Sequence, residues 1–455
     1  MSKSKVTLQL ISSSLLQDDV LMLGEAYVKL WKVPVNQPLT LKFGSFKQRV
    51  TVISVSRFDG LRMNHSLARK MGLTNGQSLR AAYKTSSQIL SLGPLIGVLV
   101  SRDYPSMPDK PFGSITSFCK ELVDACQLQG AWVCFFTPDH IQDLHNVKAW
   151  VNTNGSWQRV TMPIPDIINN RLTSRKLENK PSVQHFMKEV KSRYQSVVFN
   201  EKFLDKTEVF EALRPHAELS KYLPESYSLR TFSTLKSMCS RYTTVFLKPA
   251  RGSLGKGIIR ITRLPDHSYQ ALYSTINGTK RQQFSSLTKV FSSLSGKLKT
   301  NHYQIQQGLT LIDHSRRPVD FRALVQKNAS GKWTITSIVA RIASNQHFVS
   351  NLARGGSLST VKEAIFRTNL PPSVKNDVSA RLRRAALDIA QGVDTYIPAH
   401  FGELGIDLAV DNSGKVWLLE VNSKPSKNDN TPLGDRKIRP SVRKIVDYSR
   451  FLTGI

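Results

Sequence analysis

The chain has 455 residues, of which 40% are hydrophobic, so it is long enough for about two to four domains and is not of disordered composition. Lysine and arginine number 64 against 33 aspartates and glutamates, and the net charge of +31 favours an anionic partner: a nucleotide, nucleic acid, an acidic polymer or an anionic surface. The four cysteines show neither a CxxC pair nor zinc-finger spacing, and no segment has the apolar length of a signal peptide core or a membrane span. We therefore expect a soluble protein, cytoplasmic at synthesis, with reduced thiols.

Residues 1–88 have the pattern of a small β-rich domain. The segment LTLKFGSFKQRVTVISV, residues 39–55, alternates apolar and polar positions as half-buried strands do. A short helix and a glycine-containing turn follow in NHSLARKMGLTNGQ, residues 64–77. This order resembles small psi-type β-barrels, and no internal repeat is visible in the sequence.

Residues 91–195 are predicted to form a second, α/β domain. Two apolar runs, GPLIGVLVS at 93–101 and AWVCFFTP at 131–138, indicate buried strands. The amphipathic segment between them, residues 114–130, ends at a glycine as helices often do. Strand, helix and strand in this order predict a parallel βαβ unit of Rossmann-like type.

Residues 196–435 mix strands and helices in a third domain. Its clearest helix is the amphipathic segment VKNDVSARLRRAALDIAQGVDTY, residues 374–396. The last stretch, residues 436–455, is a basic tail that we expect to be helical after Pro440.

A glycine-rich loop separates two of the predicted strands, in FLKPARGSLGKGI at 246–258. Gly252, Gly255 and Gly257 allow close approach of the backbone to a ligand, and Lys248 and Lys256 add positive charge, which suits phosphate oxygens. A Walker A loop is excluded, because Gly257 follows Lys256 where that motif needs Ser or Thr. A plain glycine hairpin is the alternative.

Two acids interrupt apolar strands in GELGIDLAVDNSGKVWLLEVNSKPSK, residues 402–427. Asp407 lies in the first strand, Glu420 ends the second, and the turn DNSG joins them. Positions 420 and 422 face the same side of a strand, so Asp407, Glu420 and Asn422 together offer oxygens that suit magnesium. The alternative is an acid paired with a buried lysine or arginine.

Several arginines accompany these groups. Arg322 and Arg341 lie on predicted strands, and Asn351 and Arg354 lie in SNLARGGS, residues 350–357. Arginines on strands of a basic protein are usually solvated, but beside a phosphate loop they can neutralise a transferring phosphoryl group.

Taken together, these segments resemble the ATP-grasp superfamily. Four of its signatures occur in its order: LDKTEVFEAL, VFLKPARGSLGKGI, QIQQGL and LLEVNSKP. DFR and SNLARGGS resemble the RimK-type amino-acid ligases, and the whole pattern, including PDIINNR and LPES, resembles the YheC/YheD family of endospore coat-associated proteins. The resemblance implies an α/β (α+β) ATP-grasp fold at 196–435, with a lid subdomain at about 225–305. Along the chain this fold is preceded by a Rossmann-like α/β domain and, before that, by a small N-terminal β-barrel-like domain.

The resemblance also implies roles for individual residues. Lys206 and Lys248 would contact the phosphates of ATP, and Gln307 stands where RimK-like enzymes often carry Glu. The remaining assignments are the lid loop (Gly252, Ser253, Gly255, Lys256, Gly257), the adenine edge (Gln306, Gln307, Leu309), one or two Mg²⁺ ions (Asp407, Glu420, Asn422) and the phosphoryl-transfer site (Arg322, Arg341, Asn351, Arg354). With this resemblance we expect the partner of Asp407 and Glu420 to be Mg²⁺ and not a basic side chain.

The activity implied is that of an ADP-forming, magnesium-dependent carboxylate–amine ligase. A substrate carboxylate would take the γ-phosphate of ATP to form an acyl phosphate, and an amine would then displace phosphate. The basic balance favours an acidic peptide or coat protein as substrate. The alternative is a non-catalytic, ATP-binding structural or scaffolding protein of the spore coat. Nucleic-acid binding is disfavoured, because the sequence holds no RRM, helix-turn-helix or zinc motif.

Overall fold

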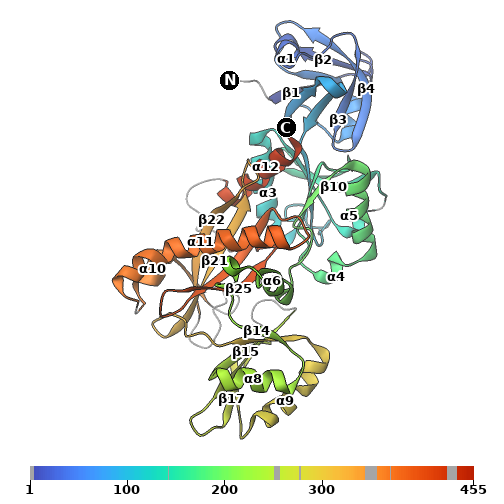
Figure 1. Ribbon diagram of the computed structural model, residues 1–455. Coiled ribbons are helices and arrows are strands. Elements are labelled where there is room, and N and C mark those ends of the chain that lie inside the picture. Colours follow the sequence, from blue (N-terminus) through green and yellow to red (C-terminus); the bar gives the residue numbers. More distant parts are fainter. Residues whose placement is uncertain are drawn as a thin grey trace.

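The computed structural model describes residues 5–141, 143–250, 257–275, 278–343, 356–368, 370–427 and 438–455. Figure 1 shows four units in a row: an N-terminal barrel, an α/β layer, a large C-terminal sheet and, at the far end, a lid. Within the described residues, no helix combines the length and the apolar character needed to cross a membrane.

The N-terminal unit is a closed barrel with the strand order β1-β5-β2-β4-β3-β7-β6. Its elements are β1 (Lys5–Ile11), β2 (Val20–Gly24), α1 (Glu25–Trp31), β3 (Pro38–Phe43), β4 (Phe46–Val55), β5 (Leu61–Asn64), α2 (His65–Met71), β6 (Ser78–Lys84) and β7 (Ile89–Gly93). The strand alternation predicted from the sequence is therefore confirmed, and the last barrel strand, β7, lies entirely after the predicted domain end at residue 88.

The barrel contains an internal structural repeat that is not visible in the sequence. Helices α1 and α2 begin 40 positions apart, and so do the strands β3 and β6 that follow them. The turns between them use left-handed backbone at matching places, Asn36 at φ 55° and Gly76 at φ 79°. β2 pairs in parallel with β4 as β5 does with β1. The two halves of the barrel are alike in their buried positions and turn geometry but share few identical residues, so the repeat is hidden in the sequence.

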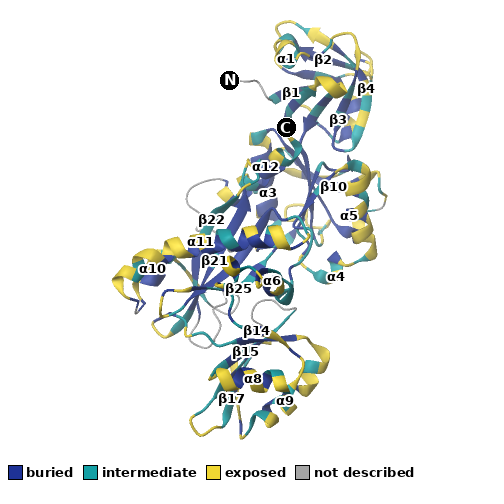
Figure 2. Cartoon of the chain, in the orientation of Figure 1, coloured by how far each residue is buried: buried dark blue, intermediate teal, exposed yellow. Residues whose placement is uncertain are grey.

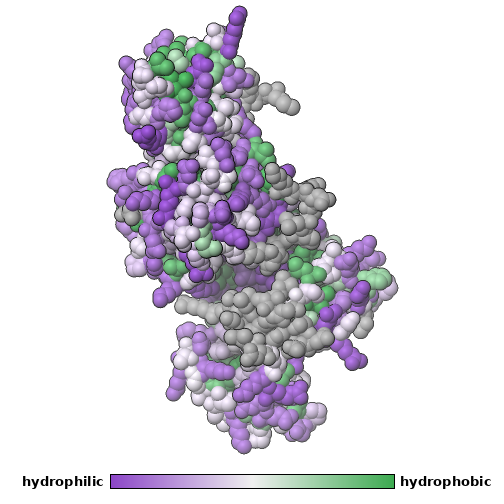
Figure 3. Space-filling model, turned by 180° about the vertical axis from the view of Figure 1, so that it is seen from behind, coloured by the Kyte–Doolittle hydropathy of each residue, from purple (hydrophilic) through white to green (hydrophobic). Residues whose placement is uncertain are grey.

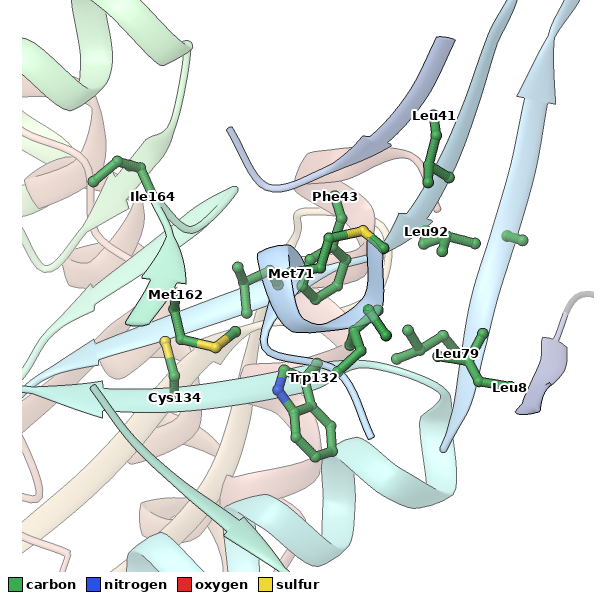
Figure 4. Packing of buried hydrophobic residues seen from close by; sticks show 14 of the residues in the cluster. Leu8, Leu41, Phe43, Met71, Leu79, Leu92, Trp132, Cys134, Met162 and Ile164 are labelled. Atoms are coloured by element: carbon green, nitrogen blue, oxygen red, sulfur yellow. The ribbon is translucent and has the colours of Figure 1, made fainter. Parts of the chain in front are cut away.

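The second unit is a sheet of order β11-β10-β9-β8-β12-β13. Its elements are β8 (Leu95–Leu99), α3 (Thr116–Gln129), β9 (Trp132–Phe136), β10 (Asn146–Thr153), β11 (Ser156–Pro163), β12 (Ile167–Asn170), α4 (Arg175–Glu178), α5 (Pro181–Tyr194) and β13 (Val197–Phe199). β8 and β9 are parallel, which confirms the predicted βαβ unit. Figure 4 shows Met71 of the barrel beside Met162 and Trp132 of this sheet, and one hydrophobic core extends through both units.

The lid is a sheet of order β14-β19-β15-β16-β17-β18 with helices on one face. Its elements are β14 (Ser226–Leu229), α8 (Phe232–Arg241), β15 (Thr244–Pro249), β16 (Ile259–Arg263), β17 (Tyr269–Thr275), β18 (Gly278–Phe284), α9 (Leu287–Thr300) and β19 (Tyr303–Gln307). Alternate strand residues, such as Val245, Leu247 and Ile305, pack with both helices in a separate small core. The other sheet face carries Lys248, Gln304 and Gln306 together with the apolar Phe246 and Leu272.

The C-terminal sheet has the order β23-β22-β21-β24-β25, with β20 added to β21. Its elements are β20 (Asp313–His314), β21 (Arg317–Lys327), β22 (Trp333–Ile342), β23 (Ser357–Thr360), β24 (Glu403–Val410) and β25 (Val416–Asn422). The surrounding helices are α6 (Lys206–Leu213), α7 (Ala217–Ser220), α10 (Val361–Phe366), α11 (Pro372–Tyr396) and α12 (Pro440–Thr453).

Helix α11 covers the apolar face of this sheet, contacting β21, β22, β24 and β25. Figure 2 shows the strands of this region largely buried and the outer surface of α10 exposed. The predicted helix after Pro440 is confirmed as α12, which packs against α3 and β21 through Val442, Ile445 and Val446. The C-terminal segment thus joins the α/β layer to the C-terminal sheet. The uncovered face of the sheet is left for polar groups.

Candidate active site

A row of charged side chains crosses the uncovered face of the C-terminal sheet. Strand register puts Arg341 of β22 opposite Asp320 of β21, Arg322 of β21 opposite Asp407 of β24, and Asp407 opposite Glu420 of β25. Four neighbouring strands therefore bring together five ionisable groups that are far apart in the chain.

Asp407 lies between two guanidinium groups. Arg322 donates to both of its oxygens, with 3.0 Å between Nη2 and Oδ2, and Arg341 Nη2 lies 3.0 Å from the same Oδ2. Burial alone would raise the pKa of this carboxyl, which is 7% exposed, but the charges of Arg322 and Arg341 lower it to about 2. Asp407 is therefore fully ionised at neutral pH.

The expectation that Asp407 and Glu420 lack basic partners is wrong. Antiparallel pairing of β21 with β24 places Arg322 directly opposite Asp407, and Lys206 Nζ lies 3.4 Å from Glu420 Oε2. Lys206 is the first residue of α6 and is brought to β25 by packing between that helix and that strand. Both acids thus have the basic partners of the alternative prediction.

Asp320 is a residue that the sequence reasoning did not assign. Its carboxylate accepts from Arg341 Nε at 2.6 Å and from Nη2 at 2.9 Å. It precedes Arg322 by two positions in the DFR segment, and this spacing puts both on one strand face. That spacing was the available signal. Asp320 and Asp407 together hold Arg341 in place.

Lys248 and Gln306 extend the site onto the lid. Lys248 Nζ donates to Gln306 Oε1 across β15 and β19. Burial, together with the nearby charge of Lys206, lowers the pKa of Lys248 to about 8 against the opposing attraction of Glu420 and Asp407. This mutual influence shows that the lid lysine and the sheet carboxylates share one electrostatic environment.

Gln306 carries the clearest mark of a ligand. The side chain is 2% exposed, and its Nε2 has no hydrogen-bond partner among the described residues. A buried amide donor without a partner is costly, so this position favours an acceptor-bearing ligand beside Lys248.

Gln307 does not join this group. Being adjacent to Gln306 on β19, its side chain lies on the opposite face of the lid sheet, where Oε1 accepts from the backbone N–H of Glu225 at 2.8 Å. Leu309 is half-buried in the segment after β19. Gly257 follows the glycine-rich loop at φ 72°, and its carbonyl accepts from Tyr303 at 3.4 Å.

The remaining predicted residues of the lid loop and transfer site lie outside the described residues: Gly252, Ser253, Gly255, Lys256, Asn351 and Arg354. Asn422 is described; it pairs with Gly405 across β24 and lies two positions from Glu420, on the same strand face.

Two buried ion pairs and one arginine anchor the segment that follows β25; of their members, Glu178 and Arg171 belong to the α/β layer, and Glu403 begins β24. Lys424 pairs with Glu178, and Lys427 pairs with Glu403. Arg171 lies 2.7 Å from the same Glu403 and donates to Pro425 O, also at 2.7 Å. The sequence reasoning missed this network, although both lysines stand directly after the predicted metal strand. The network positions the Glu420 and Asn422 strand against the second unit.

The residues fit a magnesium-bound nucleoside triphosphate. Asp407, Glu420 and Asn422 carry side-chain oxygens, which Mg²⁺ prefers as ligands, although both oxygens of Asp407 already contact arginines. Lys206 and Lys248 would offer positive charge to phosphates. No group of three His, Cys, Asp or Glu residues suited to a metal occurs in the described part of the chain. The metal assignment therefore depends on two carboxylates and one amide.

Comparison with known proteins identifies the family of the chain. The YheC/D-like ATP-grasp family model matches residues 195–452, more than half of the chain. Two proteins of Bacillus subtilis (strain 168) are similar. "Endospore coat-associated protein YheD" is 27% identical over 77% of this chain and 76% of its own length, and "Endospore coat-associated protein YheC" is 28% identical over 64% and 80%.

Solved structures are more distant in sequence. D-alanyl-alanine synthetase A from Vibrio cholerae is 12% identical with a TM-score of 0.44, over 80% of this chain and 98% of that one. D-cycloserine synthetase DcsG is also 12% identical, with a TM-score of 0.47 over 78% and 99%. Because the family model covers more than half of the chain, the chain belongs to the YheC/D-like ATP-grasp family.

Proposed function

We propose that the protein is an ATP- and magnesium-dependent, ADP-forming carboxylate–amine ligase. The observation that carries this proposal is geometric. On the C-terminal sheet and its helices, which we call the body, Asp407 lies opposite Glu420, and Lys206 Nζ lies 3.4 Å from Glu420 Oε2. On the lid, Lys248 contacts Gln306, whose buried Nε2 has no partner among the described residues. A lid lysine placed in this way suits a ligand held between lid and body, with phosphates at the lysines.

Each side chain has a role in this proposal. Lys206 and Lys248 would bind the phosphates, and Glu420, Asn422 and Asp407 would hold magnesium, which would supply positive charge to the phosphate groups.

Arg322 and Arg341 neutralise charge on the phosphoryl group as it moves to the substrate carboxylate. They are held rigid by Asp407 and Asp320, so little reorganisation is needed during the reaction. An amine then attacks the acyl phosphate and displaces phosphate. Gln306 donates its Nε2 hydrogen to the nucleotide. The chain supplies positioning and charge, and no covalent nucleophile is required.

We propose an acidic peptide or coat protein as the substrate. Between positions 225 and 305 the sequence has thirteen lysines and arginines, and its acidic residues there are Glu225 and Asp266. Figure 3 shows the lid, at the lower end of the molecule, covered largely by hydrophilic residues. Such a surface attracts an acidic polymer toward the cleft. The names of the Bacillus relatives place those proteins at the endospore coat, and we propose the same location here.

The second candidate is a non-catalytic ATP-binding scaffold of the coat, favoured by those same names. ADP release in the presence of glutamate-rich peptides and free amino acids separates the two. Ligase activity predicts release that Glu420→Ala abolishes, whereas Glu211→Gln, an exposed change on α6, leaves it intact. Tight Mg·ATP binding without release for any acceptor supports the scaffold.

A further inference from the structure

A cavity lies where the chain passes between the lid and the body, at the hinge residues Glu225 and Gln307. It has a volume of about 330 Å³, within the lower range of small-molecule sites. The residues that matter for its chemistry are Arg214, Tyr227, Tyr242, Gln307, Lys415 and Trp417.

The cavity adjoins both chain connections between lid and body. The chain enters the lid through Glu225 and leaves it at Gln307, and these residues are joined by Gln307 N to Glu225 O and by Glu225 N to Gln307 Oε1, each at 2.8 Å. Tyr227 and Tyr242 line the cavity from the lid, and Lys415 lines it from the start of β25 in the body. A ligand here would touch both parts across the hinge.

This cavity is separate from the nucleotide cluster. Gln306 directs its amide toward Lys248, whereas Gln307, the next residue of the same strand, directs its amide to the opposite face. A molecule in the cavity therefore lies behind the lid sheet and does not occupy the phosphate site.

The lining combines cations with aromatic rings. Lys415 Nζ lies 3.7 Å from the centre of the Trp417 ring, whose Nε1 is fixed by Asp411 at 2.8 Å. Arg214 extends from the body to donate to Ser226 O of the lid at 2.8 Å. Both cations are exposed enough to accept a further contact.

The acid of the cavity is already neutralised. Tyr242, Tyr227 and Arg241 all donate to the Glu225 carboxylate, with 2.8 Å for Tyr227. Burial opposes ionisation, but these three donors hold the pKa of Glu225 below its usual range. The remaining chemistry of the cavity is positive and aromatic, which selects an anion with a planar ring.

We propose that the hinge cavity is a second binding site, for a small planar anion such as an aromatic carboxylate or a nucleoside phosphate, and that its occupant changes the affinity for Mg·ATP by bridging lid and body. Because binding effects are reciprocal, Mg·ATP must change the affinity of the hinge ligand by the same factor. The proposal needs only a nucleotide-binding lid, so it stands whether or not the protein turns over.

The test uses benzoate as the probe on the full-length protein, with saturation-transfer NMR to measure its dissociation constant. Benzamide, which has the same ring without the charge, is the matched ligand. Lys415→Gln and Arg214→Gln are the variants, and Lys188→Gln on exposed α5 is the control. We expect each variant to weaken benzoate about tenfold, the loss of one charge-assisted hydrogen bond, with no change in the control or in thermal melting.

The coupling is measured by titrating Mg·ATP with and without saturating benzoate. We expect a change in ATP affinity that both variants remove. Equal binding of benzoate and benzamide, or benzoate binding unchanged in both variants, overturns the site. Simple displacement of benzoate by Mg·ATP, unaltered in Lys415→Gln, would place benzoate in the nucleotide cleft and also overturn it.

Discussion

Asp407→Asn tests how the charged row is held together. The substitution keeps the shape of the side chain but removes the negative charge that faces Arg322 and Arg341. Asp320 still compensates Arg341, with contacts of 2.6 and 2.9 Å. Arg322 is left buried without its carboxylate.

The magnitude follows from two routes. Lowering the pKa of Asp407 from 3.8 to about 2 corresponds to about 2 kcal/mol of preference for the charged form. Removing one partner of a buried ion pair costs about 3–5 kcal/mol, and the remaining Asp320 contact favours the lower end. We therefore expect the free energy of unfolding to fall by about 2–3 kcal/mol at pH 7.

Urea denaturation without nucleotide measures this loss. Asp377→Asn, an exposed i,i+4 partner of Arg381 on α11, is the matched control and should change stability by less than about 0.5 kcal/mol. Since the folded pKa of Asp407 lies below its usual value, its contribution is complete above about pH 4 and is lost as the pH falls toward 2. The difference between wild type and Asp407→Asn should narrow over that window. Equal stability of the two proteins at pH 7 would refute the reasoning.

Three further predictions concern the neighbouring groups. Glu420→Gln should weaken Mg·ATP binding, measured by calorimetry, by about tenfold. The melting temperature should stay nearly unchanged, because the contact of Glu420 with Lys206, at 3.4 Å, is longer than those of Asp407 with its arginines. Equal Mg·ATP affinity of the two proteins would contradict the metal role of Glu420. The affinity of the wild type for Mg·ATP should fall as the pH rises through about 8, where Lys248 loses its charge. Lys248→Arg stays charged and should bind Mg·ATP with little pH dependence across that range. If the affinities of the two proteins change with pH in the same way, Lys248 does not bind phosphate. Lys424→Met should lower the free energy of unfolding by about 3 kcal/mol, and Lys424→Met with Glu178→Gln by less, because the second change removes the uncompensated acid; an additive loss in urea denaturation would contradict that coupling.

Local features of this fold could be predicted from the sequence. Alternation predicted the barrel strands, apolar runs around an amphipathic segment predicted the parallel β8–α3–β9 unit, and the 3.6-residue period predicted α11. Each of these depends on neighbours within one element. The barrel repeat was missed for the same reason, since it resides in backbone geometry and burial, with few identical residues.

The candidate site divides in the same way. The residue types at Asp407, Glu420, Lys206 and Lys248 are sufficient to indicate phosphate and metal chemistry. Their contacts could not be predicted, because Arg322 is separated from Asp407 by 85 positions and Lys424 from Glu178 by 246. The orientation of the Gln307 side chain away from Lys248 likewise depends on the register in which β19 pairs with β15.

The sequence by itself determined the chemical groups, the order of the elements and the family. Only the tertiary structure decided the partner of each charge, because strand register sets which side chains face one another, and a shift of one residue would turn Asp407 toward the apolar core under α11. Burial of that apolar face against α11 selects the register, and the register in turn places two arginines on Asp407 and a lysine on Glu420.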